Sequence, residues 1–183
     1  MLKILRTPCA IINIQKGDSK LQRSACFTGH RNLSENENTV SKRLSALLER
    51  LVTDEGVTDF YAGGAVGFDT IAAKCVLRLR EKYKQVRLRL VLPCPNEEQT
   101  RGWTATQKYE FKIILSRADS VEYTSDHLYR GCMGVRNARL VERADAYCIC
   151  YYDKTRKSGT SQTVGMAKKK GLEITNLFDR KGE

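Results

Sequence analysis

Short apolar runs alternate with longer amphipathic stretches along this chain from residue 24 onward, and this order constrains the fold most strongly. The apolar runs have the length of buried strands, and the stretches between them carry apolar residues at helical spacing. The best-defined helix is expected over residues 37–53, with Ser34 as its cap. Alternating strands and helices predict an α/β fold with a mostly parallel sheet of five to seven strands and helices on both faces.

The chain has 183 residues, a length that fits one domain. We expect residues 1–23 to be an N-terminal extension and residues 24–183 to form a single domain, because no repeat or low-complexity linker interrupts the pattern. No apolar run reaches the roughly 18 residues of a membrane helix. The apolar start is broken by Arg6 and Pro8 and lacks a signal-peptide cleavage pattern. We therefore expect a cytoplasmic protein without a membrane partner.

Cysteine usage and charge narrow the chemistry. The chain has 7 cysteines and 2 histidines, and no C-x-x-C occurs, so we expect reduced thiols, no metal site and no cofactor. The formal net charge of +11 favours an anionic partner. A phosphorylated, nucleotide-like small molecule is the first expectation. Nucleic acid is the alternative, although no aromatic residues interleave the basic clusters as they do in single-strand binders.

The loops that follow the strands are the candidate site, because ligands of parallel α/β sheets bind beyond the carboxyl ends of the strands. The sharpest loop is GGAVGFD at residues 63–69, between an apolar run and an amphipathic stretch. A strand, a glycine turn and a helix present backbone N–H groups and a helix dipole to a phosphate. The loop is neither the dinucleotide fingerprint nor a Walker loop. The alternative is a structural turn in which Asp69 caps the helix.

Two further loops carry anion-binding chemistry. Residues 28–31, Thr-Gly-His-Arg, follow the first strand, and Arg31 suits bidentate phosphate binding while His30 can titrate near neutral pH. Ser158 and Gly159 precede the last long helix, where hydroxyls and N–H groups would form a second anion site. A structural loop and ordinary capping by Thr160 or Ser161 are the alternatives.

The candidate ligand-binding residues come from all of these loops, and no catalytic residue is assigned. Tyr129, Arg136 and Asn137 are expected to stack on a base, bind a phosphate and read a polar edge. The full set is Thr28, Gly29, His30, Arg31, Gly63, Gly64, Ala65, Gly67, Phe68, Asp69, Pro93, Tyr129, Arg136, Asn137, Asp153, Ser158, Gly159, Thr160 and Thr163.

Five segments resemble the YpsA-like family of the SLOG superfamily, which also contains the DNA-processing protein A domain and the lonely-guy phosphoribohydrolases. They are CFTGHR (26–31), YAGGAVGFDTIAA (61–73), LPCP (92–95), SDHLYRGCMGVRN (125–137) and YYDKTRKSGTSQTVGMAKKKG (151–171). The resemblance implies a Rossmann-like, doubly wound core with a nucleotide-type ligand at the rim of the sheet. Relatives in the superfamily often pair, so a homodimer or larger homo-oligomer is an open expectation.

The resemblance also bears on catalysis. The phosphoribohydrolases carry P-G-G-x-G-T-x-x-E, whose glutamate is needed to split the N-glycosidic bond, and Thr163 stands at the position of that glutamate. A hydroxyl cannot replace this carboxylate. We therefore expect a protein that senses or sequesters an ADP-ribose-like or cyclic nucleotide signal rather than a catalyst. The alternatives are a nucleotide N-glycosidase that uses Asp69 or Asp153, and a DNA-binding relative of the DNA-processing protein.

Overall fold

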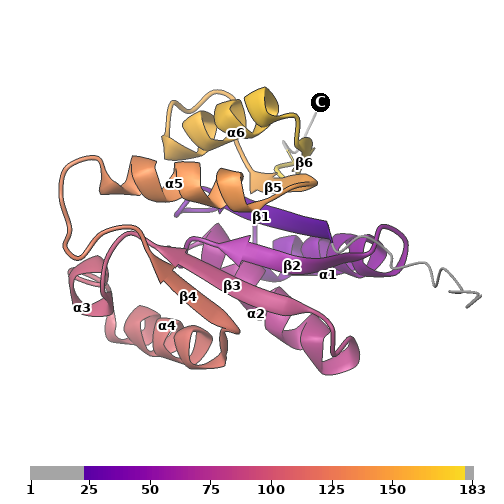
Figure 1. Ribbon diagram of the computed structural model, residues 1–183, viewed down its shortest axis with the longest axis horizontal. Coiled ribbons are helices and arrows are strands. Elements are labelled where there is room, and N and C mark those ends of the chain that lie inside the picture. The colour runs from indigo at the N-terminus through magenta and orange to yellow at the C-terminus, as the bar shows by residue number, and fades with distance from the viewer. Residues whose placement is uncertain (1–22, 180–183) are drawn as a thin grey trace, which may run out of the picture.

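The computed structural model describes residues 23–179, apart from the side chains of residues 96 and 97 (Figure 1). A six-stranded, all-parallel sheet forms its centre, which confirms the expected α/β sheet. The expected N-terminal extension lies outside the described residues, except that Arg23 is the first residue of a strand. The strands are β1 (Arg23–Gly29), β2 (Val57–Ala62), β3 (Arg87–Leu92), β4 (Ser120–Tyr123), β5 (Tyr147–Tyr151) and β6 (Glu173–Asn176).

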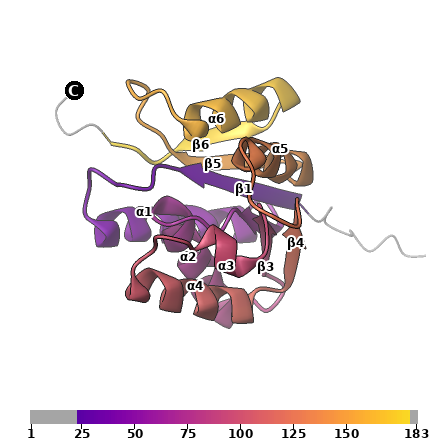
Figure 2. The ribbon, with the colours of Figure 1, turned by 90° about the vertical axis from the view of Figure 1, so that its left-hand side faces the viewer.

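Helices cover both faces of the sheet, as Figure 2 shows, so the Rossmann-like doubly wound arrangement is confirmed. One layer holds α1 (Glu37–Thr53), α2 (Phe68–Lys82) and α4 (Ala105–Arg117), and the other holds α5 (Cys132–Arg143) and α6 (Gly159–Lys170). The single-turn helix α3 (Asn96–Gln99) was not expected from the sequence. Within residues 23–179, no helix has the length and apolar character that crossing a membrane requires.

The strand order β4-β3-β2-β1-β5-β6 places a topological reversal at the centre of the sheet. The chain winds outward from β1 to β4 and then returns to β5 on the other side of β1. The loops after β1 and β5 therefore leave the sheet side by side and lead to helices on opposite faces. In open parallel sheets this reversal is where ligands bind.

The larger core lies between the sheet and the layer of α1, α2 and α4. Phe27 of β1 stacks on Phe60 of β2 with ring centroids 6.0 Å apart, and the edge of Phe68 meets Phe27 at 6.4 Å. Phe68 is the first residue of α2 and has no exposed surface. Burial of its ring removes apolar area from water, and it fixes the start of α2 against β1.

The expected cap of the first helix is wrong by two positions. Asn36 is the N-cap of α1, and its side chain accepts a hydrogen bond from the N–H of Asn38 at 2.9 Å. Ser34 instead hydrogen-bonds the hydroxyl of Tyr151, 3.0 Å away at the end of β5. The loop after β1 is thereby tied to the neighbouring strand.

Candidate functional site

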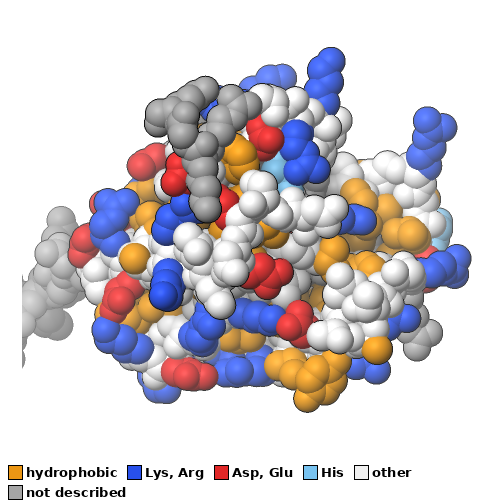
Figure 3. Space-filling model, turned by 180° about the vertical axis from the view of Figure 1, so that it is seen from behind, with side chains coloured by type: hydrophobic (Ala, Val, Ile, Leu, Met, Phe, Trp, Pro, Cys, Tyr) orange, Lys and Arg blue, Asp and Glu red, His pale blue; other side chains and the backbone are white. Residues whose placement is uncertain are grey.

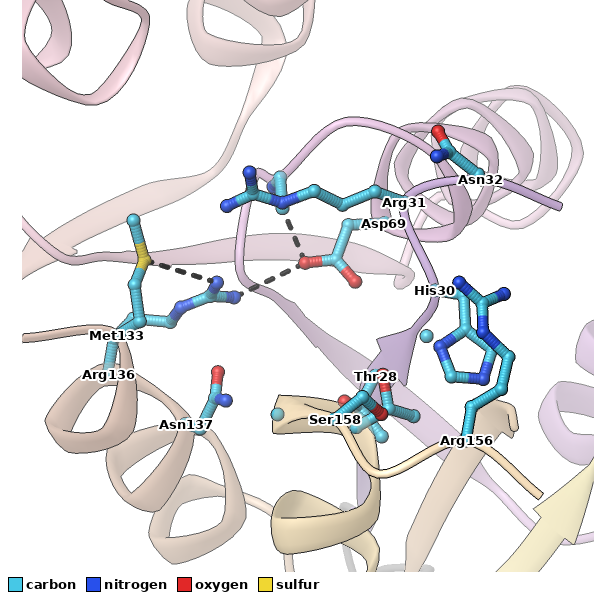
Figure 4. Close-up of a pocket in the computed structure, with 14 residues that line it drawn as sticks. Thr28, His30, Arg31, Asn32, Asp69, Met133, Arg136, Asn137, Arg156 and Ser158 are labelled. Carbon is cyan, nitrogen blue, oxygen red and sulfur yellow. Dashed lines mark hydrogen bonds and ion pairs between the residues drawn. The ribbon is translucent and has the colours of Figure 1, made fainter. Parts of the chain in front are cut away.

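A pocket of about 320 Å³ opens at the carboxyl edge of the sheet, beside the reversal between β1 and β5 (Figure 4). Its walls come from the loops after β1, β2 and β5 and from the first turns of α5 and α6. Most of the predicted candidates thus meet in one place. Those that line the pocket are Thr28, Gly29, His30, Arg31, Ala65, Asp69, Arg136, Asn137, Ser158, Gly159 and Thr160.

The start of α6 forms one wall of the pocket. The N-cap is Ser158, whose Oγ accepts the N–H of Ser161 at 3.4 Å, while Ser161 Oγ accepts the N–H of Ser158 at 3.2 Å. This reciprocal capping box corrects the expectation of a cap at Thr160 or Ser161. Gly159 and Thr160 are the first helical residues, and N–H groups at such positions lack acceptors within the helix. The wall therefore suits an anion.

The glycine loop after β2 differs from the expected phosphate cradle. Gly67 has φ 84°, and a Cβ there would lie 2.2 Å from the carbonyl oxygen of Arg31. The N–H of Phe68 donates to the carbonyl of His30 at 3.2 Å, so the first N–H of α2 is already bonded. This loop packs against the loop after β1, and Gly67 allows that close approach.

The same loop approaches α5 just as closely. A Cβ on Gly63 would lie 1.3 Å from Nη1 of Arg136. Gly63, Gly64, Gly67 and Phe68 do not line the pocket, which takes only Ala65 and Asp69 from this loop and the start of α2. The predicted importance of the glycines thus has a packing explanation.

Asp69 and Arg136 form a buried ion pair at the pocket wall. Arg136 Nη1 donates to Asp69 Oδ2 at 3.3 Å, and the exposed fractions of the two side chains are 8% and 5%. The same oxygen accepts the N–H of Ala65 at 3.4 Å, so Asp69 braces its loop and does not cap α2 at the N-cap position. Burial raises the pKa of Asp69, and Arg136 acts in the opposite direction. Within the described residues, Arg136 Nε is buried without a hydrogen-bond partner.

His30 connects the loops after β1 and β5. The Nε2 atom of its ring accepts the backbone N–H of Asp153 at 3.0 Å, and the backbone N–H of His30 donates to the carbonyl of Tyr151 at 3.2 Å. Burial lowers the pKa of His30, and the positive charge of Arg156 lowers it further. The lowered pKa favours the neutral imidazole, and its Nε2 is already engaged as an acceptor.

Two arginines face the pocket without partners. Arg31 follows β1, and Arg156 follows β5 on the loop that leads to α6. Both are exposed, and neither side chain has a hydrogen bond or ion pair with any residue in the described part of the chain. Figure 4 shows the two guanidinium groups on different sides of the opening. They give the pocket an excess of positive charge, because Arg136 is balanced by Asp69.

Four other candidates lie away from the pocket lining. Pro93 is buried, and Tyr129 is 42% exposed with its ring tilted against that of His127. Asp153 accepts hydrogen bonds from the N–H and hydroxyl of Thr155. Thr163 has no exposed surface, and its hydroxyl donates to the carbonyl of Gly159 at 2.8 Å. The expected base-stacking role of Tyr129 has no support in this arrangement.

Asn32, Met133 and Arg156 line the pocket and were missed. Arg156 stands two residues before the N-cap of α6, and a positive residue close to a predicted anion-binding helix start was the available signal. Asn32 is the residue directly after Arg31, which was itself a predicted site residue. No sequence signal marked Met133, which lies in the first turn of α5.

Metal-binding chemistry is not evident in this region. Across residues 23–179, no three His, Cys, Asp or Glu side chains group in a way that would hold a metal ion. The cysteines of the described chain are buried and free. Burial raises the pKa of Cys150 to about 12, so this thiol is protonated.

Comparison with known proteins identifies the family. The YpsA family model, described as the YspA SLOG family, matches residues 26–177. The chain belongs to this family. The match covers β1 from Cys26 onward, the strands from β2 to β6 and every residue that lines the pocket, so the pocket lies wholly within the YpsA domain.

Three relatives each cover more than two thirds of the chain. The chain is 32% identical over 139 residues to the uncharacterized SPbeta prophage-derived protein YoqJ of Bacillus subtilis, covering 69% of this chain and 79% of YoqJ. It is 27% identical over 143 residues to the UPF0398 protein BH1768 of Halalkalibacterium halodurans, covering 77% and 71%. A UPF0398 protein of Bacillus thuringiensis is 28% identical over 139 residues, covering 75% and 73%.

Proposed function

We propose that this protein binds a nucleotide or nucleotide-derived small molecule through its phosphate, and holds the molecule as a sensor or sequestering protein. One observation carries the proposal. Arg31, Arg156 and the start of α6 converge on one pocket, and neither guanidinium has a partner in residues 23–179. Charge-assisted hydrogen bonds from arginine and N–H groups at a helix start are the usual means of holding a phosphate.

The positions of the candidate carboxylates favour ligand binding without hydrolysis. Asp69 is paired with Arg136, Asp153 lies outside the pocket lining, and Thr163 is buried where the phosphoribohydrolase motif has its glutamate. A carboxylate that activates water or stabilises a positive sugar centre needs an unbalanced negative charge at the reacting atoms, and Arg136 balances that of Asp69.

A small molecule is favoured over nucleic acid by the distribution of charge. Figure 3 shows Lys and Arg side chains spread over one face with Asp and Glu between them. A nucleic-acid surface would gather positive charge into a continuous stripe. The unpaired arginines of the pocket are instead confined to a cavity of about 320 Å³.

Calorimetric titration with AMP, ADP-ribose and NAD tests the proposal. Arg156→Ala should weaken binding roughly tenfold or more, because a charge-assisted hydrogen bond is lost. The matched control is Lys154→Ala on the same loop, which removes a charge outside the pocket lining and should change affinity by less than about threefold.

Two outcomes would overturn the proposal. One is the absence of binding by all three molecules at low ionic strength. The other is free base or free ribose in the chromatogram after incubation with the wild-type protein, since a protein that only holds its ligand returns it intact.

A further inference from the structure

We infer that the pocket recognises a phosphorylated ribose and leaves the base unread, so that nucleotides with different bases bind alike. This inference rests on the proposed function and names the part of the ligand that the site selects. It follows from the side chains that line the pocket and from those that do not.

The lining offers no platform for a base. Among the described residues that line the pocket there is no Phe, Tyr or Trp, although protein sites often hold bases by stacking them on such rings. His30 is the one ring present, and it is 5% exposed and held between the backbone of Asp153 and the rings of Tyr151 and Tyr152. Tyr129, the nearest aromatic residue along the chain to α5, lies outside the lining.

We assign the two arginines of the lining to the phosphate and not to a base edge. A guanidinium plane stacks on every base in a similar way, because each base has a π-face. Arg31 and Arg156 also carry the unbalanced positive charge of the pocket, which a phosphate neutralises. Stacking of a base on these side chains would add affinity without choosing between bases, and the phosphate takes up their hydrogen-bond donors.

The remaining polar groups fit sugar hydroxyls. Asp69 Oδ2 is occupied by Arg136 and Ala65, and the Gly63 N–H also hydrogen-bonds this carboxylate, whose other oxygen points in Figure 4 toward the open middle of the pocket. Asn137, one turn after Met133 on α5, is half-buried and lies close to Gly159 at the start of α6. A carboxylate that accepts and an amide that both donates and accepts can bond neighbouring hydroxyl groups of a ribose beside a phosphate at α6.

Pocket size agrees with this ligand. A volume of about 320 Å³ lies at the lower end of small-molecule sites, whose usual range is roughly 300–1,000 Å³. Such sites are mostly apolar and aromatic when they enclose a whole drug-sized ligand, and this one is polar. A phosphate and a pentose occupy it, and an attached base extends toward solvent.

The test is a calorimetric series with ribose 5-phosphate, AMP, GMP, UMP, 2′,3′-dideoxy-AMP and adenosine. We expect ribose 5-phosphate and the three nucleotides to bind within about threefold of one another, which is less than the effect of one hydrogen bond. The dideoxy analogue should bind roughly tenfold more weakly, because the pocket's polar groups lose their hydroxyl partners. Adenosine should show no binding.

A variant pair separates the sugar contact from the phosphate contact. Asn137→Ala should weaken ribose 5-phosphate binding and leave the affinity for inorganic phosphate unchanged. Val135→Ala on the same helix is the control, since Val135 is exposed and lies outside the lining, and it should change neither affinity.

The possible failures are distinguishable. If none of the phosphorylated molecules binds, the proposed function itself is wrong. If AMP binds more than tenfold tighter than both UMP and ribose 5-phosphate, the proposed function stands and the base is read after all. If the dideoxy analogue matches AMP, the hydroxyl contacts assigned to Asp69 and Asn137 are wrong.

Discussion

Arg136 of α5 and Asp69 of α2 pair across the carboxyl edge of the sheet, with Nη1 and Oδ2 3.3 Å apart and both side chains more than nine-tenths buried. The pair joins helices that lie on opposite faces, because α2 belongs to the layer of α1 and α4 and α5 packs beside α6. Its two charges cancel at the wall of the pocket. Breaking the pair therefore tests the architecture of the site as well as its electrostatics.

Removing the charge of Asp69 alone should be costly. Asp69→Asn leaves Arg136 buried without a counter-charge, and such losses cost about 3–5 kcal/mol in the free energy of unfolding. The surface pair of Arg117 and Glu81 is the control, and Arg117→Gln should cost at most about 1 kcal/mol. Urea denaturation measures both. If the two substitutions lower the free energy of unfolding equally, the buried pair is no more important for stability than the surface pair.

Acid should weaken the fold through His30. The pKa of this imidazole is lowered from its ordinary 6.5 by burial, so the unfolded chain takes up its proton first as pH falls. The contribution to stability is complete above pH 6.5 and is lost as pH falls from 6.5 through the lower folded pKa. Asp153, Arg156, Tyr151 and Tyr152 surround the ring, and the backbone N–H of Asp153 keeps its Nε2 engaged as an acceptor.

The free energy of unfolding measured between about pH 5 and 7.5 checks this sign. His30→Gln keeps an acceptor for the Asp153 N–H but does not titrate, so its stability should vary less with pH than that of the wild type. His127→Gln, at an exposed position, should retain the wild-type dependence. A wild-type curve that rises on acidification would contradict the assignment.

The glycine at the start of α2 should not tolerate a side chain. In Gly67→Ala the new Cβ meets the carbonyl oxygen of Arg31, and φ 84° is strained for alanine, so we expect a loss of about 2–4 kcal/mol in unfolding free energy. Gly134→Ala is the matched control within α5, where a Cβ meets no atom within 4 Å. That substitution should stabilise by roughly 0.5–1 kcal/mol. Thermal unfolding distinguishes the two directions.

Restoring the motif glutamate should not restore a catalyst. Thr163 is fully buried, so Thr163→Glu forces a carboxylate into an apolar interior and should destabilise by several kcal/mol. Gln162→Glu places the same charge at the exposed neighbouring position and should be nearly neutral. Thermal unfolding measures the loss of stability, and chromatography after incubation with AMP shows whether adenine is released. A folded Thr163→Glu variant that releases adenine would show that this position does reach the pocket.

Much of the fold was available from local patterns. The bounds of the helix over residues 37–53 agree with the expectation, because the helical period can be recognised among neighbouring residues. The helix cap was misplaced from Asn36 to Ser34, because several polar residues precede the helix and each satisfies the same local preference. The pocket lining was anticipated at residues 28–31, which end β1 and follow it directly, and at residues 158–160, which begin α6.

The amino-acid sequence by itself determined the alternation of strands and helices, the polar loops after the strands and the glycines in the turn before α2, since these depend on residues close together in the chain. Only the tertiary structure decided that Asp69 pairs with Arg136, 67 residues away, and that His30 accepts from Asp153, 123 residues away. The tertiary structure also decided that Thr163 is buried and that Arg156 lines the pocket. The physical reason is the strand order, because placing β5 beside β1 brings distant loops together and settles which side chains face the pocket.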